Sequence, residues 1–246
     1  MDLFGSNGKE REMLKEKADN LTRCNDDDSW RWYPNPGPNS YLSVTTIVEH
    51  GSPVPQKLKN WFKKNSEKKI AETLKQTAEQ GTRFHELAES HVSGIDVEVP
   101  ESLQAHSKAF KIWVVENKVK PLFTEQTLVS DKYGYAGTAD LIAEVNGVPC
   151  VVDYKTSEVF KRGHYGRQLA AYRMAAIEME LLPPDCGMIC LQIGRNTARL
   201  FAGVYQQYES CERAFLTSLE ALKFDAYYKL KKIGWKWLNQ HSLERK

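Results

Sequence analysis

The chain has 246 residues, of which 41% are hydrophobic and 27% are charged, and its formal net charge is +2. This composition is ordinary for a globular protein long enough to bury one sizeable core. No apolar run approaches the roughly 18 residues that a membrane span needs, so a soluble protein without a membrane partner is expected.

The N-terminal sequence has neither the apolar segment of a secretory signal nor the acid-poor composition of a transit peptide. We therefore expect a cytoplasmic protein, either of a bacterium or of a virus-infected cell. Five cysteines are an odd number in a chain of this length. They fit buried thiols in a reducing compartment better than a disulfide framework.

The first half of the chain is predicted to be mainly helical. Residues 1–40 combine a charged, helix-like stretch with a segment rich in proline and turn formers, which favours a loosely ordered N-terminal arm. Residues 41–120 are expected to form a helical region. Apolar residues recur at helical spacing over 55–80 and 82–92, with Gly81 as the joint, and again over 101–118.

The pattern then changes to short segments of period two, and residues 121–230 are predicted to form an α/β core. Strands are expected over 122–130, 137–145, 148–156, 187–194 and 198–205, and helices over 163–180 and 209–230. This order predicts helices packed on a central sheet. Residues 231–246 form a tail in which lysines alternate with aromatic residues.

Net charge does not indicate a nucleic-acid binder, but the distribution of charge is uneven. Basic residues gather over 56–69, over 161–168 and in the C-terminal tail. Such patches are typical of proteins that bind a phosphate backbone. Each patch is also compatible with a solvated helix face or a frayed tail, and for any single patch that interpretation is favoured.

The turn at 146–147, Asn-Gly, predicts a two-residue hairpin between the second and third strands. Val145 then faces Val148, and each step away from the turn adds one residue on each strand. Counting in this way places Asp140 directly across from Asp153. Alternation puts both carboxylates and Lys155 on one face of the sheet, and Leu141 and Val152 with their apolar neighbours on the other.

Two like charges at directly opposed positions destabilise a hairpin. Three arrangements relieve this repulsion: both acids are solvated, one is protonated, or a cation lies between them. A hard divalent ion fits best, because carboxylate oxygens are the ligands that Mg²⁺ prefers and Lys155 supplies one positive charge against two negative ones. An ammonium beside a metal-activated water would suit hydrolysis of a phosphodiester.

Four motifs occur in an order and spacing that resemble the RecB-type branch of the PD-(D/E)XK nuclease superfamily. They are QGTRFHELAE at 80–89, GTAD at 137–140, VVDYKTS at 151–157 and QLAAY at 168–172. Within that branch, the stretch from residue 43 to the last helix is similar to the mitochondrial genome maintenance exonucleases. The resemblance implies a restriction-endonuclease-like core, that is, a mixed central sheet flanked by helices, with an N-terminal helical elaboration.

The resemblance also implies roles for individual residues. The catalytic residues would be Asp140, Asp153 and Lys155. The metal ligands would be His85, Asp140, Asp153 and the backbone carbonyl of Tyr154, with Mg²⁺ or Mn²⁺ as the cofactor. Gln168 and Tyr172 would position the phosphate or the network around the metal, although they also suit an amphipathic packing pair.

Some relatives bind an iron–sulfur cluster through four cysteines. The count is matched here by Cys24, Cys186, Cys190 and Cys211, but the tight C-terminal spacing is not, and no cluster is expected. The expected activity is that of a metal-dependent exonuclease on single-stranded DNA with a free end. The alternatives are an endonuclease or a nuclease that processes duplex ends, and, in a different class, a catalytically silent DNA-binding scaffold of recombination.

Overall fold

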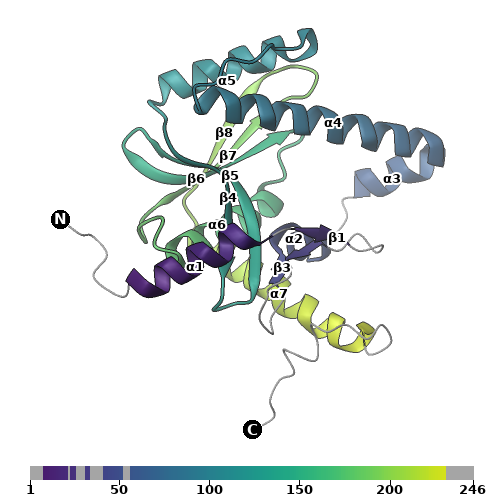
Figure 1. Ribbon diagram of the computed structural model, residues 1–246. Helices are drawn as coiled ribbons and strands as arrows, with labels where there is room; N and C mark the ends of the chain where they lie inside the picture. The colour runs from purple at the N-terminus through teal and green to yellow at the C-terminus, as the bar shows by residue number, and fades with distance from the viewer. Residues whose placement is uncertain (1–7, 22, 26–30, 34–40, 52–55, 231–246) are drawn as a thin grey trace.

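The computed structural model describes residues 8–21, 23–25, 31–33, 41–51 and 56–230. The tail predicted over 231–246 and much of the predicted N-terminal arm lie outside these residues. An eight-stranded mixed sheet forms the centre, in the order β1-β2-β3-β5-β6-β7-β8, with β4 also paired to β5. Helices cover both faces of this sheet (Figure 1). The predicted α/β class, a mixed sheet flanked by helices, is therefore confirmed.

The elements have the following bounds. The strands are β1 Cys24–Asn25, β2 Arg31–Tyr33, β3 Tyr41–Ser43, β4 Lys120–Ser130, β5 Tyr135–Val145, β6 Val148–Thr156, β7 Gly187–Ile193 and β8 Leu200–Tyr205. The helices are α1 Gly8–Asn20, α2 Val44–His50, α3 Gln56–Lys64, α4 Glu67–Val92, α5 Gln104–Glu116, α6 Arg162–Glu178 and α7 Tyr208–Leu230. A single 3₁₀ turn, Glu101–Leu103, precedes α5.

The hairpin of β5 and β6 has the register that the Asn-Gly turn predicts. Val145 pairs with Val148 and Leu141 pairs with Val152 in an antiparallel ladder. Asn146 and Gly147 both have positive φ, as a tight two-residue turn requires. The next residues beyond the ladder are Asp140 and Asp153, so the two carboxylates emerge at the same end of the hairpin.

Both faces of the sheet are buried, by two separate clusters of side chains. One cluster joins alternate residues of β5 and β6, such as Leu141 and Val152, to Phe84 of α4 and Phe110 of α5. The other joins Ile142 and the opposite face to helices α2, α6 and α7. The β5–β6 ladder ends at the pair of Leu141 and Val152, so Asp140 and Asp153 lie where the two strands stop pairing.

The predicted joint at Gly81 is wrong: α4 runs without a break from Glu67 to Val92. The break lies earlier, where α3 ends at Lys64 and the Ser66 hydroxyl accepts a hydrogen bond from the Lys69 N–H at 3.4 Å. Serine at this position satisfies a free N–H group of the first turn, which explains why a new helix begins there. Gly81 lies inside this helix, on the side that faces the sheet.

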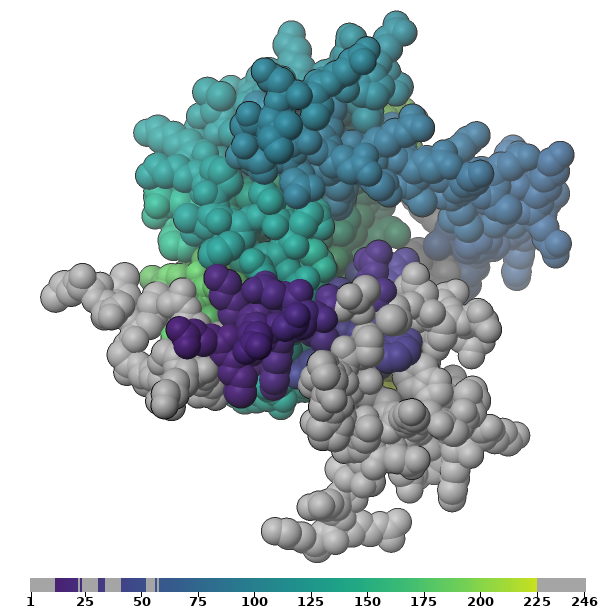
Figure 2. Space-filling view, in the orientation of Figure 1, coloured from purple at the N-terminus to yellow at the C-terminus, as the bar shows by residue number. Residues whose placement is uncertain are grey.

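Helix α3 and the N-terminal half of α4 project from the body as an arm (Figures 1 and 2). The side chains of this arm are mostly exposed, whereas α4 becomes buried from Phe84 onwards, where it lies on the sheet. Near the N-terminus, helix α1 packs on the body of the protein through Leu14 and Ala18. Among the described residues, no helix is both long and apolar enough to cross a bilayer.

Gly137 of β5 is required by close packing. A Cβ atom at this position would lie 2.7 Å from Cε1 of Tyr172 and 2.9 Å from Cγ2 of Val44. Neither neighbour has room to move, because Tyr172 and Val44 are both buried. The absence of a side chain at Gly137 thus lets α2 and α6 approach the strand together.

Replacing Gly137 with alanine is expected to lower the free energy of unfolding by about 1–3 kcal/mol, the usual effect of overpacking a core. Urea unfolding followed by circular dichroism measures this change. The matched control is Gly163→Ala in the first turn of α6, where an added Cβ meets no atom within 4 Å. The control should be neutral or slightly stabilising, and equal effects of the two substitutions would contradict the packing argument.

Candidate active site

His85 and Asp140 come together where the buried half of α4 crosses the end of the β5–β6 hairpin. The His85 Nδ1 lies 3.3 Å from Oδ1 of Asp140. The second oxygen of Asp140 accepts the Tyr154 N–H at 2.5 Å. Gly81 permits this approach of helix to strand, because a Cβ there would already lie 3.3 Å from Oγ1 of Thr156.

Glu125 of β4 completes a cluster of three potential metal ligands with His85 and Asp140. One ligand atom from each of the three side chains lies within 4.8 Å of the others. On β4, Thr124 pairs with Leu141 and Gln126 pairs with Ala139, so Glu125 is across from Asp140. Glu125 has a φ of 45°, in the left-handed region that a non-glycine residue rarely adopts.

Asp153 and Lys155 form an ion pair beside this cluster. The Lys155 Nζ lies 2.6 Å from Oδ2 of Asp153, and only 1% of Asp153 is exposed. Asp153 is not among the three grouped ligands. In this structure its carboxylate is directed to the lysine, and its expected role as a metal ligand stays a prediction.

Gln168 and Tyr172 lie one turn apart on α6, which covers the face of the sheet that carries Asp153. The Gln168 side-chain amide donates a hydrogen bond to the Tyr172 hydroxyl at 3.0 Å. Both side chains are buried, and Tyr172 also packs against Gly137. The pair therefore has a packing role, and its expected contribution to phosphate positioning stays a prediction.

The ionisable groups of the site alter the pKa values of one another. Burial alone would raise the pKa of Asp140, but His85, Lys155 and the Tyr154 N–H together lower it. Burial raises the pKa of Asp153 to about 6, against the lowering effect of Lys155. Burial would lower the pKa of Lys155, but the carboxylates of Asp153 and Asp140 raise it above its ordinary value. Lys155 is therefore an ammonium at neutral pH.

The cluster of His85, Glu125 and Asp140 contains two carboxylates but only one group that can carry a positive charge. Burial and then the charge of Asp140 raise the pKa of Glu125 to about 7, although part of the Glu125 side chain is open to solvent. Burial lowers the pKa of His85, and Asp140 more than compensates, so the net shift is upward. Two carboxylates that share one imidazole indicate a site that a divalent cation would stabilise.

The donor set fits Mg²⁺ or Mn²⁺. Two oxygen ligands about 2.1 Å from one Mg²⁺ are at most about 4.2 Å apart, so atoms within 4.8 Å of one another need only small movements to share an ion. Carboxylate oxygens suit both metals, and an imidazole ligand favours the transition metal. His85, Glu125 and Asp140 are the side chains that would hold the ion.

Glu125 was missed by the sequence analysis, although a signal for it exists. The segment from Asp131 to Gly134 joins β4 to β5, and Ser130 pairs with Tyr135. Counting five residues outward from that pair on each strand reaches Glu125 and Asp140. The connection has no strong two-residue turn signature, so its register was not predicted in the way that the Asn-Gly turn allowed.

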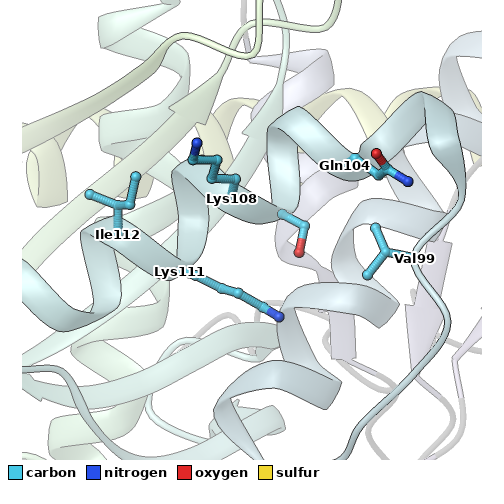
Figure 3. Close-up of a pocket in the computed structure, with 6 residues that line it drawn as sticks. Val99, Gln104, Lys108, Lys111 and Ile112 are labelled. Carbon is cyan, nitrogen blue, oxygen red and sulfur yellow. The ribbon is translucent and has the colours of Figure 1, made fainter.

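Cys190 of β7 is the cross-strand partner of Asp153, and burial and the charge of Asp153 raise the pKa of its thiol. Cys186 is buried just before β7, where burial raises the pKa of its thiol, and Cys211 lies in α7. One shallow hollow lies along α5, with Lys108 and Lys111 extending in different directions (Figure 3). None of the candidate ligands lines that hollow or a second one between α4 and residues 97–103.

Comparison with known proteins adds little to this description. No family model matches the chain, and no curated protein is similar to it. Among solved structures, the crystal structure of SSO0001 matches 79% of this chain and 84% of its own, at 16% identity and a TM-score of 0.32. A likeness at this level carries no argument about function, which therefore rests on the residues themselves.

Glu125→Gln is expected to weaken Mn²⁺ binding at least about tenfold, because it removes one anionic ligand from a set of three. Titration calorimetry on the full chain measures the affinity. Glu116→Gln, which changes an exposed acid on α5 in the same way, is the control and should bind as the wild type does. Unchanged affinity in Glu125→Gln would remove Glu125 from the proposed metal centre.

Proposed function

We propose that this protein is a metal-dependent deoxyribonuclease that hydrolyses phosphodiester bonds, acting as an exonuclease on single-stranded DNA. The observation that carries the proposal is one cluster of side chains. Ligand atoms of His85, Glu125 and Asp140 lie within 4.8 Å of one another, next to the ion pair of Asp153 and Lys155. The resemblance of the four sequence motifs to RecB-type nucleases supports the same reaction.

A divalent cation held by His85, Glu125 and Asp140 would supply Lewis acidity to a phosphate oxygen and to water. Lys155 contributes a fixed positive charge. Its raised pKa means that it donates hydrogen bonds and does not act as a general base at neutral pH. An ammonium in this place orients the attacking water and stabilises negative charge that develops on the phosphate oxygens.

Asp153 holds Lys155 in position through the 2.6 Å ion pair, and both lie near the end of β6. Water adds to phosphorus, the bond from phosphorus to the leaving oxygen breaks, and the leaving oxygen takes up a proton. No covalent enzyme intermediate is needed. A rigid strand supplies Asp153 and Lys155, and a buried helix supplies His85, so the reacting groups are held before substrate arrives.

The preference for a single strand with a free end is a separate part of the proposal, and it is supported by the projecting arm. Exposed lysines of the projecting arm, namely Lys59, Lys63, Lys64, Lys68 and Lys69, provide cations for a phosphate backbone. Trp61 and Phe62 lie among them, with their rings 5.3 Å apart. Cations interspersed with aromatic rings are typical of proteins that bind unpaired strands.

Lys155→Met is expected to lower the cleavage rate of a labelled oligonucleotide by at least about 100-fold, because it removes charge stabilisation while keeping most of the side-chain volume. Asp153→Asn should reduce the rate similarly. Lys111→Ala, an exposed lysine of α5, is the control. Thermal unfolding of each variant excludes loss of fold, and full activity in Lys155→Met would refute the assignment of this site.

Cleavage of linear and of closed circular single-stranded DNA of the same sequence distinguishes an exonuclease from an endonuclease. An exonuclease degrades the linear form in Mg²⁺ or Mn²⁺ and leaves the circle intact, and EDTA stops the reaction. Rapid cutting of the circle would establish an endonuclease instead. Oligonucleotides blocked at the 5′ or the 3′ end then report the direction of digestion, and a duplex with blunt ends tests the processing of duplex ends.

No cleavage under any of these conditions, together with retained DNA binding, would favour the catalytically silent scaffold.

A further inference from the structure

Two apolar side chains are exposed beside the candidate active site, at the edge of the sheet. Val159 is 66% exposed in the segment that joins β6 to α6, and Phe201 is 50% exposed on the edge strand β8. Phe160, which follows Val159 in the chain, is partly buried, and its ring lies 5.0 Å from that of Phe201 at an interplanar angle of 79°. An exposed aromatic ring held in place by a second ring offers a rigid surface on which a base can stack.

The backbone of β8 is shaped to hold Phe160 in this position. A Cβ atom at Gly203 would lie 2.4 Å from Cζ of Phe160, so the ring rests where only glycine leaves room. Tyr205, two residues further along β8, packs on the same side, and its hydroxyl donates to the Arg162 carbonyl at 2.7 Å. The Phe160 ring is thus fixed by the strand beneath it and does not belong to a loosely placed loop.

Ring contacts connect this surface to the candidate active site. Phe160 lies 5.5 Å from Tyr165, edge to face. The Lys155 Nζ in turn lies 5.7 Å from the centroid of the Tyr165 ring. Lys155 lies near the end of strand β6, before the segment that carries Phe160, five residues later, so this surface adjoins the Lys155 side of the candidate site.

The electrostatic environment of the surface is positive. Lys161 and Arg162 are exposed at the N-terminus of α6, whose first N–H groups have no side-chain cap. Burial, then Lys161, Lys155 and Arg167, lower the pKa of His164 to about 4. The acid of this segment, Glu158, accepts the Asn196 N–H at 2.6 Å on the β7–β8 loop.

We propose that the stretch of single-stranded nucleic acid next to the cleaved bond binds here, with one base stacked on the exposed ring of Phe201, which the perpendicular ring of Phe160 supports, and its phosphates near Lys161 and Arg162. The inference rests on the proposed function, because it assumes that the nucleic acid is cleaved beside Lys155. Flat apolar rings flanked by cations match the chemistry of an unpaired base and its phosphate. A protein partner would be an alternative occupant of the same rings, and the test distinguishes it.

The test measures binding of a fluorescent single-stranded oligonucleotide to the full chain by anisotropy in EDTA, where no cleavage occurs. Phe201→Ala is expected to raise Kd about tenfold or more, and Phe201→Trp should restore binding. The control is Val204→Ala, a residue 54% exposed on the same strand but on the opposite face, by strand alternation. This control should leave Kd unchanged, and thermal unfolding of each variant confirms the fold.

An oligonucleotide with abasic positions throughout separates stacking from charge. Wild type and Phe201→Ala should bind it equally, because no base is left to stack, whereas Lys161→Glu should weaken binding of both oligonucleotides. Equal Kd values for wild type and Phe201→Ala on the normal oligonucleotide would overturn the proposal. A protein partner would then be the alternative occupant of the two rings. Absence of any oligonucleotide binding by the wild type would overturn it as well.

The outcomes are independent of whether the chain is a nuclease. If Phe201→Ala weakens binding but the wild type cleaves nothing in Mg²⁺ or Mn²⁺, the proposed nuclease activity is refuted and the proposed binding surface is supported. If the wild type cleaves and Phe201→Ala binds and cleaves normally, the surface fails and the activity stands.

Discussion

Two buried carboxylates and a half-buried ammonium lie together at one end of the β5–β6 ladder, and the candidate site depends on how these charges are balanced. Asp153 is 1% exposed and Asp140 is 9% exposed. Charges removed from water to this extent are tolerated only with close partners. Lys155 forms an ion pair with Asp153, whereas His85 and the Tyr154 N–H are the partners of Asp140. Glu125 then adds a further carboxylate without adding a cation, which makes a divalent ion the natural complement.

The architecture explains why this arrangement persists. Helices pack on both faces of the sheet, and the charged groups gather where β5 and β6 stop pairing after Leu141 and Val152. Helix α4 brings His85 to that place because Phe84, its neighbour in sequence, is buried against the rings of Phe110 and Tyr154. One turn of helix thus carries both an apolar anchor and a polar ligand, and the packing of the first determines the position of the second.

The candidate site and the surface around Phe160 and Phe201 share a structural origin. Both arise where β6 ends: the strand supplies Asp153 and Lys155, and the segment after it supplies Phe160 and the start of α6. Helix α3 and the first half of α4 project from the body (Figure 1), and their exposed lysines provide basic side chains from a different part of the chain. Such a layout would suit the proposed substrate, a long and flexible polyanion, because the phosphate at the site and the neighbouring nucleotides need separate contacts.

The local part of this arrangement was determined by the sequence. The Asn-Gly turn and strand alternation gave the register of the hairpin, the shared end of Asp140 and Asp153, and the common face of Asp153 and Lys155, because both signals act over a few residues. Helical periodicity likewise located most helices, although Gly81 was mistaken for a break. The resemblance of the motifs implied that His85 joins Asp140, but the packing of α4 that brings them together was decided by the tertiary structure. The same holds for Glu125, which meets Asp140 through the pairing of β4, and for Phe160, which meets Phe201 across the sheet edge. The geometry of these contacts follows from the packing of whole elements, and the connection between β4 and β5 has no turn signature strong enough to fix its register in advance.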